Sequence, residues 1–132
     1  MYLLDTNAII ILLYGEVSDG KLSPESIEKM KTADKLYLSV ASLWEMAIKI
    51  KLGKLQIKRT IEEIESACTA NGIEVIPIKA MHMDKSMELP LIQDHKDPFD
   101  RLILSVALTE ELTLISTDAR MRKPEYGVSI IC

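Results

Sequence analysis

Four acidic side chains stand at positions in the sequence where they could act together. Asp5 follows the apolar segment MYLL and Asp118 follows TLIST, so each stands where a short buried strand would end. Asp100 lies in the first turn of a helix predicted to open at Asp97, and Glu45 is the only charged side chain in SVASLWEMAI. Carboxylates gathered in surroundings poor in water repel one another, and a divalent cation such as Mg²⁺ or Mn²⁺ removes that cost. Such a metal activates water and contacts phosphate oxygens, which is the chemistry of phosphodiester hydrolysis.

Each of these acids also has a simpler structural interpretation. A carboxylate can cap the segment that follows it by accepting hydrogen bonds from the first backbone N–H groups, and this applies to Asp5, Asp97 and Asp118. Asp100 would be favourable near the positive end of a helix even without a metal. Glu45 has Lys49 four residues later, which is the spacing of an ion pair on an exposed helix face. For Asp97 the cap is the favoured interpretation, whereas the joint placement of the others favours a site.

Short strands and helices that alternate along the chain would position these acids. Apolar and branched segments predict strands at residues 2–4, 36–40, 73–78, 112–116 and 127–132. Helical spacing, caps and stop signals predict helices at residues 7–14, 24–34, 42–52, 60–70, 79–89 and 97–111. Strands separated by helices imply an α/β fold with a mainly parallel sheet of about five strands, covered by helices on both faces. In such sheets, binding sites lie beyond the carboxyl ends of the strands.

The composition limits the class of protein. The chain has 132 residues, 48% of them hydrophobic and 27% charged, which is typical of one globular domain and excludes disorder and low complexity. A formal net charge of −4 argues against a protein that simply coats nucleic acid. Cys68 and Cys132 lack metal-ligand spacing and are predicted to be free thiols in a reducing compartment. Because no run is apolar enough to span a membrane and no basic segment begins a signal peptide, we expect a cytoplasmic protein without a membrane partner.

Four segments, in the order LLDTN, SLWEMAIKIKLGKL, DPFDRLILSVAL and LISTD, resemble the PIN-domain family over nearly the whole chain. Within that family, the sequence is most similar to the VapC-type toxins of bacterial and archaeal toxin–antitoxin pairs. The resemblance implies a PIN-like α/β/α sandwich and a single domain over residues 1–132. It also implies a Mg²⁺-dependent endoribonuclease that inhibits translation or growth, with Mn²⁺ as the alternative ion. The partners it implies are an RNA substrate, a small antitoxin and a second copy of the chain in a homodimer.

Carried over residue by residue, the resemblance assigns the catalytic acids to Asp5, Glu45, Asp100 and Asp118. The metal ligands would be Asp5, Asp100 and Asp118, with Glu45 and Asp97 contributing through water. Polar residues that would orient these carboxylates, unless they are ordinary turn and cap formers, are Thr6, Asn7, Ser116 and Thr117. Basic residues that would contact RNA phosphates, unless they form a solvated surface, are Lys49, Lys51, Arg101, Arg120 and Arg122.

Other function classes make demands that the sequence meets less well. A phosphatase of the haloacid-dehalogenase kind needs a second acid two residues after Asp5, where this chain has Asn7. A response-regulator receiver needs a neighbouring acid pair and a late strand-end lysine, and the sequence shows neither. A PIN-like module that binds RNA or protein without cleavage is the alternative that stays open, although the four acids argue against it.

The histidines and methionines give no further site. His82 and His95 are isolated from cysteine and from one another, so they predict no zinc site and are expected at the surface or in loops. The methionines are expected to be mostly core residues: Met81, Met83 and Met87 in one predicted helix, and Met30, Met46 and Met121 elsewhere. A dimer interface or a surface for an antitoxin helix is the alternative for a few of them.

Overall fold

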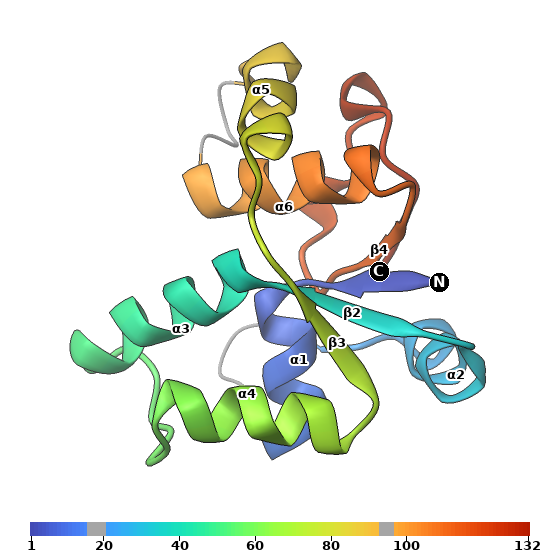
Figure 1. Ribbon diagram of the computed structural model, residues 1–132. Helices are drawn as coiled ribbons and strands as arrows, with labels where there is room; N and C mark the ends of the chain where they lie inside the picture. Colours follow the sequence, from blue (N-terminus) through green and yellow to red (C-terminus); the bar gives the residue numbers. More distant parts are fainter. Residues whose placement is uncertain (16–20, 93–96) are drawn as a thin grey trace.

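The computed structural model describes residues 1–15, 21–92 and 97–132, and Figure 1 shows them arranged around one central sheet. His95 lies outside the described residues. All neighbouring strands of the sheet run parallel, and their order across it is β3-β2-β1-β4-β5. The strands are β1 (Tyr2–Leu4), β2 (Leu36–Ser39), β3 (Ile73–Ile76), β4 (Thr113–Ile115) and β5 (Ile130–Ile131). The predicted α/β fold with a parallel sheet is therefore confirmed.

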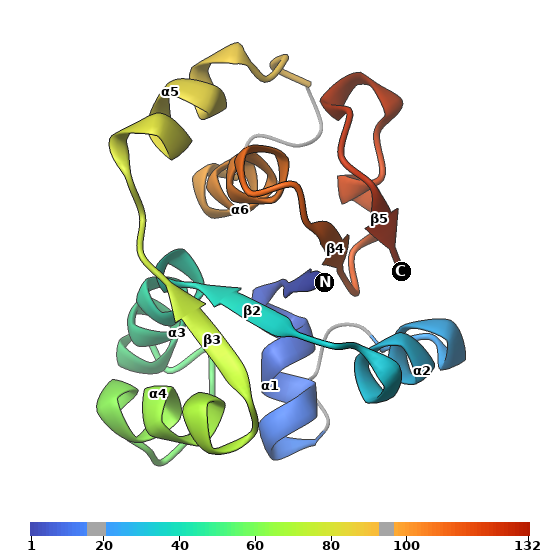
Figure 2. The same cartoon turned by 45° about the vertical axis from the view of Figure 1, so that its right-hand side comes forward.

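Helices cover both faces of this sheet, as Figures 1 and 2 show, with α1 and α4 on one side and α5 and α6 on the other. The helices are α1 (Thr6–Tyr14), α2 (Pro24–Thr32), α3 (Val40–Lys51), α4 (Ile61–Ala70), α5 (Ala80–Glu88) and α6 (Pro98–Thr109). Two 3₁₀ turns that the sequence did not indicate follow β4, namely η1 (Ala119–Met121) and η2 (Pro124–Tyr126). Within the described ranges, no helix is long and apolar enough to cross a membrane.

Side chains that alternate along the central strands supply the two hydrophobic cores of the sandwich. Leu4 and Ile115 point into the core that α1, α3 and α4 cover, whereas Leu3 and Leu114 point into the core that α6 covers. All four side chains are fully buried. Because successive strand residues face opposite sides, each of these short strands contributes to both cores. The ends of β1 and β4 are thereby fixed in the middle of the molecule.

Local capping decides where several helices begin. Ser39 was expected inside a strand that continues to Val40, but its hydroxyl accepts a hydrogen bond from Ala41 N at 3.1 Å and starts α3. The predicted capping box at Thr60 and Glu63 is confirmed, since each side chain accepts a hydrogen bond from the other's backbone N–H at 3.1 Å. Caps of this kind satisfy backbone donors that have no partner within the helix.

His82 lies in the interior, and the expectation of a surface or loop position for it is wrong. It is fully buried where α5 packs on α6. Its Nδ1 accepts a hydrogen bond from Lys79 N at 3.0 Å, and its Nε2 lies 2.8 Å from Glu110 Oε1. With both ring nitrogens bonded, the imidazole is buried without an unsatisfied polar atom.

Replacing His82 with alanine should lower the free energy of unfolding by about 2–4 kcal/mol, because it leaves a cavity and removes the partner of Lys79 N and of Glu110. Urea denaturation followed by circular dichroism measures this change. The matched control is Asp84→Ala, an exposed position on the same helix, where we expect a change within about 0.5 kcal/mol. Equal losses in the two variants would contradict the proposed role of His82.

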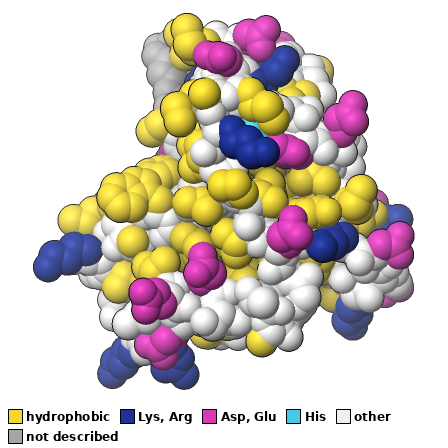
Figure 3. Space-filling model, viewed as in Figure 1, with side chains coloured by type: hydrophobic (Ala, Val, Ile, Leu, Met, Phe, Trp, Pro, Cys, Tyr) yellow, Lys and Arg dark blue, Asp and Glu magenta, His cyan; other side chains and the backbone are white. Residues whose placement is uncertain are grey.

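The methionines divide between the interior and the surface. Met30, Met46 and Met121 are buried as expected, whereas Met81, Met83 and Met87 are exposed, so the prediction of core positions was wrong for these three. The reason is that α5 buries His82 against α6 and turns its methionines outward. Figure 3 shows hydrophobic side chains gathered between α3 and α5, and Trp44 of α3 is 63% exposed. The alternative of a protein interface therefore stays open for the methionines of α5.

Candidate active site

The acids converge at the point where the order of the strands reverses. The strand β1 pairs with β2 on one side and with β4 on the other, so the chain crosses the sheet in opposite directions from β1. Crevices form at such points outside the carboxyl ends of the strands. Asp5 directly follows β1, and its backbone N–H donates to Ile115 O at 3.0 Å, where β4 ends. Asp118 comes three residues after that strand end.

A cavity of about 400 Å³ opens at this edge of the sheet, and all of the predicted acids line it. Its lining residues are Asp5, Thr6, Asn7, Glu45, Lys49, Asp97, Asp100, Thr117, Asp118, Ala119, Arg120 and Met121. Ser116 lies directly behind the cavity, because its hydroxyl donates to the Asp5 carboxylate. Residues from four separate parts of the sequence are thus brought together around one hollow.

Asp5 is the most deeply buried of these acids, with 6% of its surface exposed. One carboxylate oxygen accepts a hydrogen bond from Ala8 N at 2.8 Å, which caps α1, and the other accepts from the Ser116 hydroxyl and from Thr117 N. Burial raises the pKa of Asp5 to about 6. The hydrogen bonds from Ser116 and from the backbone lower this pKa, and the negative charge of Asp100 raises it. The carboxylate therefore caps a helix and also faces the cavity with a charge that a cation would stabilise.

Glu45 reaches the cavity from α3 and is 8% exposed. Thr6 Oγ1 donates to its Oε1 at 2.6 Å, and Lys49 Nζ lies 3.0 Å from its Oε2. The predicted ion pair between Glu45 and Lys49 is present, but both residues line the cavity and do not lie on an exposed helix face. Ser42, which sequence reasoning missed, is buried behind Thr6 with its Oγ 3.1 Å from Thr6 Oγ1. Its position after β2, at the same sheet edge as Asp5, was a signal that could have identified it.

The remaining acids come from α6 and from the turn after β4. Asp97 caps α6 as expected, since its Oδ1 accepts hydrogen bonds from Phe99 N at 2.8 Å and Asp100 N at 3.2 Å. Asp100 lies in the first turn of that helix, where a negative charge is favourable. Asp118 caps η1, and the guanidinium of Arg120 binds its carboxylate. Asp97 and Asp118 therefore each cap a helix and also line the cavity.

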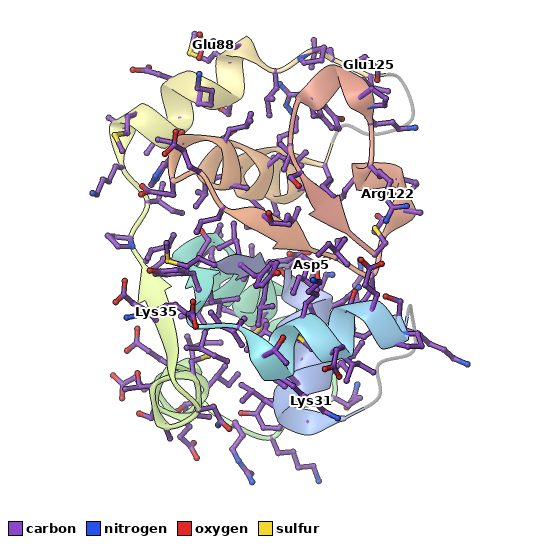
Figure 4. The ribbon with its side chains drawn as sticks, turned by 90° about the vertical axis from the view of Figure 1, so that its right-hand side faces the viewer. Asp5, Lys31, Lys35, Glu88, Arg122 and Glu125 are labelled. Carbon is purple, nitrogen blue, oxygen red and sulfur yellow. The ribbon has the colours of Figure 1, made fainter. Side chains whose placement is uncertain are left out.

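The predicted RNA-binding residues have different surroundings. Lys49 and Arg120 line the cavity, whereas Lys51 and Arg122 are exposed outside its lining. In Figure 4, Asp5 lies between the two helical layers and Arg122 lies on the segment that follows β4. The expectation of an RNA contact does not fit Arg101. Its guanidinium donates to three backbone carbonyls near the end of α5, those of Ser86, Leu89 and Pro90, at 2.8–2.9 Å, which ties α5 to α6.

The chemistry of the donors fits a hard divalent cation, because carboxylate oxygens predominate in the cavity and the Asp5 carboxylate is buried beside the negative charge of Asp100. In this arrangement, Glu45 binds Lys49 and Asp118 binds Arg120. Within the described part of the chain, no three acidic, histidine or cysteine side chains are close enough together to hold one ion as they stand. Coordination by several of these acids therefore requires side-chain rearrangement.

Comparisons with known proteins agree with this architecture. The model of the PIN domain family matches residues 2–125. A chain in the structure of FitAcB from Neisseria gonorrhoeae is 16% identical, with a TM-score of 0.64 and coverage of 100% of this chain and 97% of that chain. A chain in a toxin–antitoxin complex from Klebsiella pneumoniae is 19% identical, with a TM-score of 0.62 and coverage of 100% and 97%.

A chain of VapBC2 from Rickettsia felis, in a structure bound to a DNA fragment from the promoter, is 22% identical, with a TM-score of 0.64 and coverage of 98% and 96%. At these identities the likeness concerns the fold. A comparison with curated proteins gives no significant match. The family match spans nearly the whole sequence and includes every acid of the cavity. The chain therefore belongs to the PIN domain family.

Proposed function

We propose that this protein, as one PIN-like domain over residues 1–132, is a metal-dependent endoribonuclease that hydrolyses RNA phosphodiester bonds. The observation that carries the proposal is the set of acids that line one cavity at the carboxyl ends of β1 and β4: Asp5, Glu45, Asp97, Asp100 and Asp118. Membership of the PIN domain family supports it, because PIN domains are generally nucleases.

The proposed metal ligands are Asp5, Asp100 and Asp118, with Glu45 and Asp97 contributing through water. A bound Mg²⁺, or Mn²⁺ as the alternative, supplies an activated water and a positive charge near the phosphate. Ser116 and the backbone N–H of Thr117 fix the orientation of Asp5, and Thr6 fixes that of Glu45. Such hydrogen bonds hold acidic ligands in place against their mutual repulsion. Asn7 also lines the cavity, and its proposed role is to help orient these carboxylates.

The proposed RNA-binding residues are the cations at and around the cavity: Lys49, Lys51, Arg120 and Arg122. Lys49 and Arg120 stand in the cavity wall, where they would contact the phosphates that flank the scissile bond. The exposed Lys51 and Arg122 would add attraction that depends on salt. The net charge of −4 does not oppose this, because a cation bound in the cavity offsets the charge of its acids.

Structured RNA incubated with the purified protein should be cleaved in Mg²⁺ buffer, and an excess of EDTA should abolish the cleavage. Adding Mg²⁺ beyond the EDTA concentration should restore it. Gel electrophoresis of a labelled RNA measures both steps, and heat-treated protein is the control for contaminating nuclease. Binding of the RNA without cleavage in Mg²⁺ and Mn²⁺ would instead support the alternative, a PIN-like module that binds RNA or protein.

We further propose that the protein is the toxin of a toxin–antitoxin pair, cytoplasmic, and that it forms a homodimer. The similarity in fold to chains from a toxin–antitoxin complex and from VapBC2 supports the first part. Exposed hydrophobic side chains such as Trp44, Met83 and Met87 support the presence of a protein partner, since exposed apolar surface of this kind is common at interfaces. The expected consequence in cells is growth arrest that the antitoxin relieves.

A further inference from the structure

The guanidinium of Arg120 uses most of the hydrogen-bonding capacity of the Asp118 carboxylate. The backbone N and the Nε of Arg120 lie 2.9 and 3.1 Å from Asp118 Oδ1, and its Nε and Nη2 lie 3.2 and 2.8 Å from Oδ2. Both carboxylate oxygens are therefore bound by the same residue. A planar guanidinium matches a carboxylate in this two-pronged way, and it matches a phosphate in the same way.

The pair is placed where it can open at low cost. Asp118 caps η1 and Arg120 lies within it, two residues later. The Arg120 side chain is 65% exposed, against 25% for Asp118. Ion pairs with this degree of exposure contribute little to stability, so the guanidinium can change its partner without unfolding the turn. Both residues line the cavity that also contains Asp5 and Asp100.

We propose that Arg120 exchanges partners during binding, leaving Asp118 for an RNA phosphate and so releasing Asp118 to the metal. The inference rests on the proposed function, because it takes Asp118 as a metal ligand. A carboxylate oxygen that coordinates a cation cannot keep its full set of hydrogen bonds to Arg120, and a phosphate offers the guanidinium an equivalent partner. Metal and RNA therefore favour each other's binding, and by linkage the coupling is the same in either order of addition.

The metal side of the exchange is tested without RNA. Isothermal titration of Mn²⁺ into the purified protein should show binding to Arg120→Gln that is about 3- to 10-fold tighter than to the wild type, because a competing cation is gone. Arg120→Lys keeps the charge but lacks the planar donors, so its affinity should lie between the two. The matched control is Arg59→Gln, which removes the same charge at an exposed position outside the cavity lining and should change the Mn²⁺ affinity less than about twofold.

The RNA side is tested in EDTA, where no cleavage occurs on the proposed mechanism. Fluorescence anisotropy with a labelled RNA hairpin should show about 3- to 10-fold weaker binding to Arg120→Gln than to the wild type. The same substitution thus moves the two affinities in opposite directions, which a merely structural role for Arg120 would not do. Circular dichroism of each variant shows whether it is folded.

Unchanged or weaker Mn²⁺ binding by Arg120→Gln would overturn the inference while leaving the metal site in place. Tighter Mn²⁺ binding with unchanged RNA affinity would overturn the exchange, since Arg120 would then compete for Asp118 without contacting phosphate. If the wild type binds no Mn²⁺, or if Asp5→Asn binds it equally well, the proposed metal site fails and the inference fails with it.

Discussion

Replacing Asp5 with asparagine is expected to reduce RNA cleavage on the order of 10³-fold, because it removes a buried negative charge from the centre of the acidic cavity. Asparagine keeps the shape of the side chain and can still accept the hydrogen bond that Ala8 N donates to the cap. Initial rates on a structured RNA in Mg²⁺ buffer measure the loss. In cells, expression of the variant should no longer arrest growth if the protein is a toxin.

The same substitution should make the protein more stable at neutral pH in EDTA. Burial raises the pKa of Asp5 to about 6 from an ordinary value of 3.8, so the folded protein holds this proton more tightly than the unfolded chain does. The stabilisation due to Asp5 is present below pH 4 and is lost as the pH rises through about 6, which amounts to about 3 kcal/mol. Asparagine does not ionise, so it avoids this loss of stability. Its amide nitrogen cannot accept the hydrogen bond from Thr117 N, so we expect the free energy of unfolding at pH 7 to increase by only about 1 kcal/mol.

The control for both effects is Asp34→Asn, which removes the same charge at an exposed position before β2. This variant should cleave RNA like the wild type and should lack the gain in stability expected of Asp5→Asn. Urea denaturation at pH 4.5 and pH 7 gives the stability of all three proteins. Cleavage by Asp5→Asn within tenfold of the wild-type rate would contradict the assignment of Asp5 as a metal ligand.

Local sequence signals were enough to predict the sheet and the convergence of the acids. A short apolar strand followed by an acid, as at Leu4 and Asp5, identifies the end of a buried strand, and parallel strands place such ends at one edge of the sheet. Ser23 and Thr60 start helices through the hydrogen bonds that their types predict. These features depend on neighbours in the sequence, which is why they could be predicted from it.

Features that depend on packing between distant elements could not be predicted in this way. The buried His82 is paired with Glu110, which lies 28 residues later at the C-terminal cap of α6, and no local pattern indicates that partner. Arg101 bonds to carbonyls at the end of α5 because α5 and α6 pack together, although its place beside Asp100 indicated an RNA contact. For Asp5, capping a helix and taking part in the site are not alternatives, because one carboxylate oxygen caps α1 and the other accepts the hydrogen bond from Ser116.

Ser116 connects the two strand ends of the site, and this makes its replacement a sharp test of how Asp5 is held. It is fully buried after β4, its hydroxyl donates to the Asp5 carboxylate, and its Oγ accepts a hydrogen bond from Asp118 N at 2.9 Å. Among the groups that lower the pKa of Asp5, the Ser116 hydroxyl has the largest effect. Ser116→Ala should therefore raise the pKa of Asp5 beyond about 6 and leave its orientation less fixed.

We expect Ser116→Ala to cleave RNA about 10- to 100-fold more slowly than the wild type at pH 7. Because a carboxylate must lose its proton to bind a metal, the rate falls below the pKa of Asp5, and raising that pKa moves this fall to higher pH. The deficit should therefore shrink as the pH is raised from 6 to 9 in cleavage assays. Ser105→Ala is the control, since that buried hydroxyl donates to Arg101 O at 2.7 Å within α6 and should leave the pH profile unchanged. A deficit in Ser116→Ala that is the same at every pH would show that Ser116 acts on the packing of the strand end and not on the proton of Asp5.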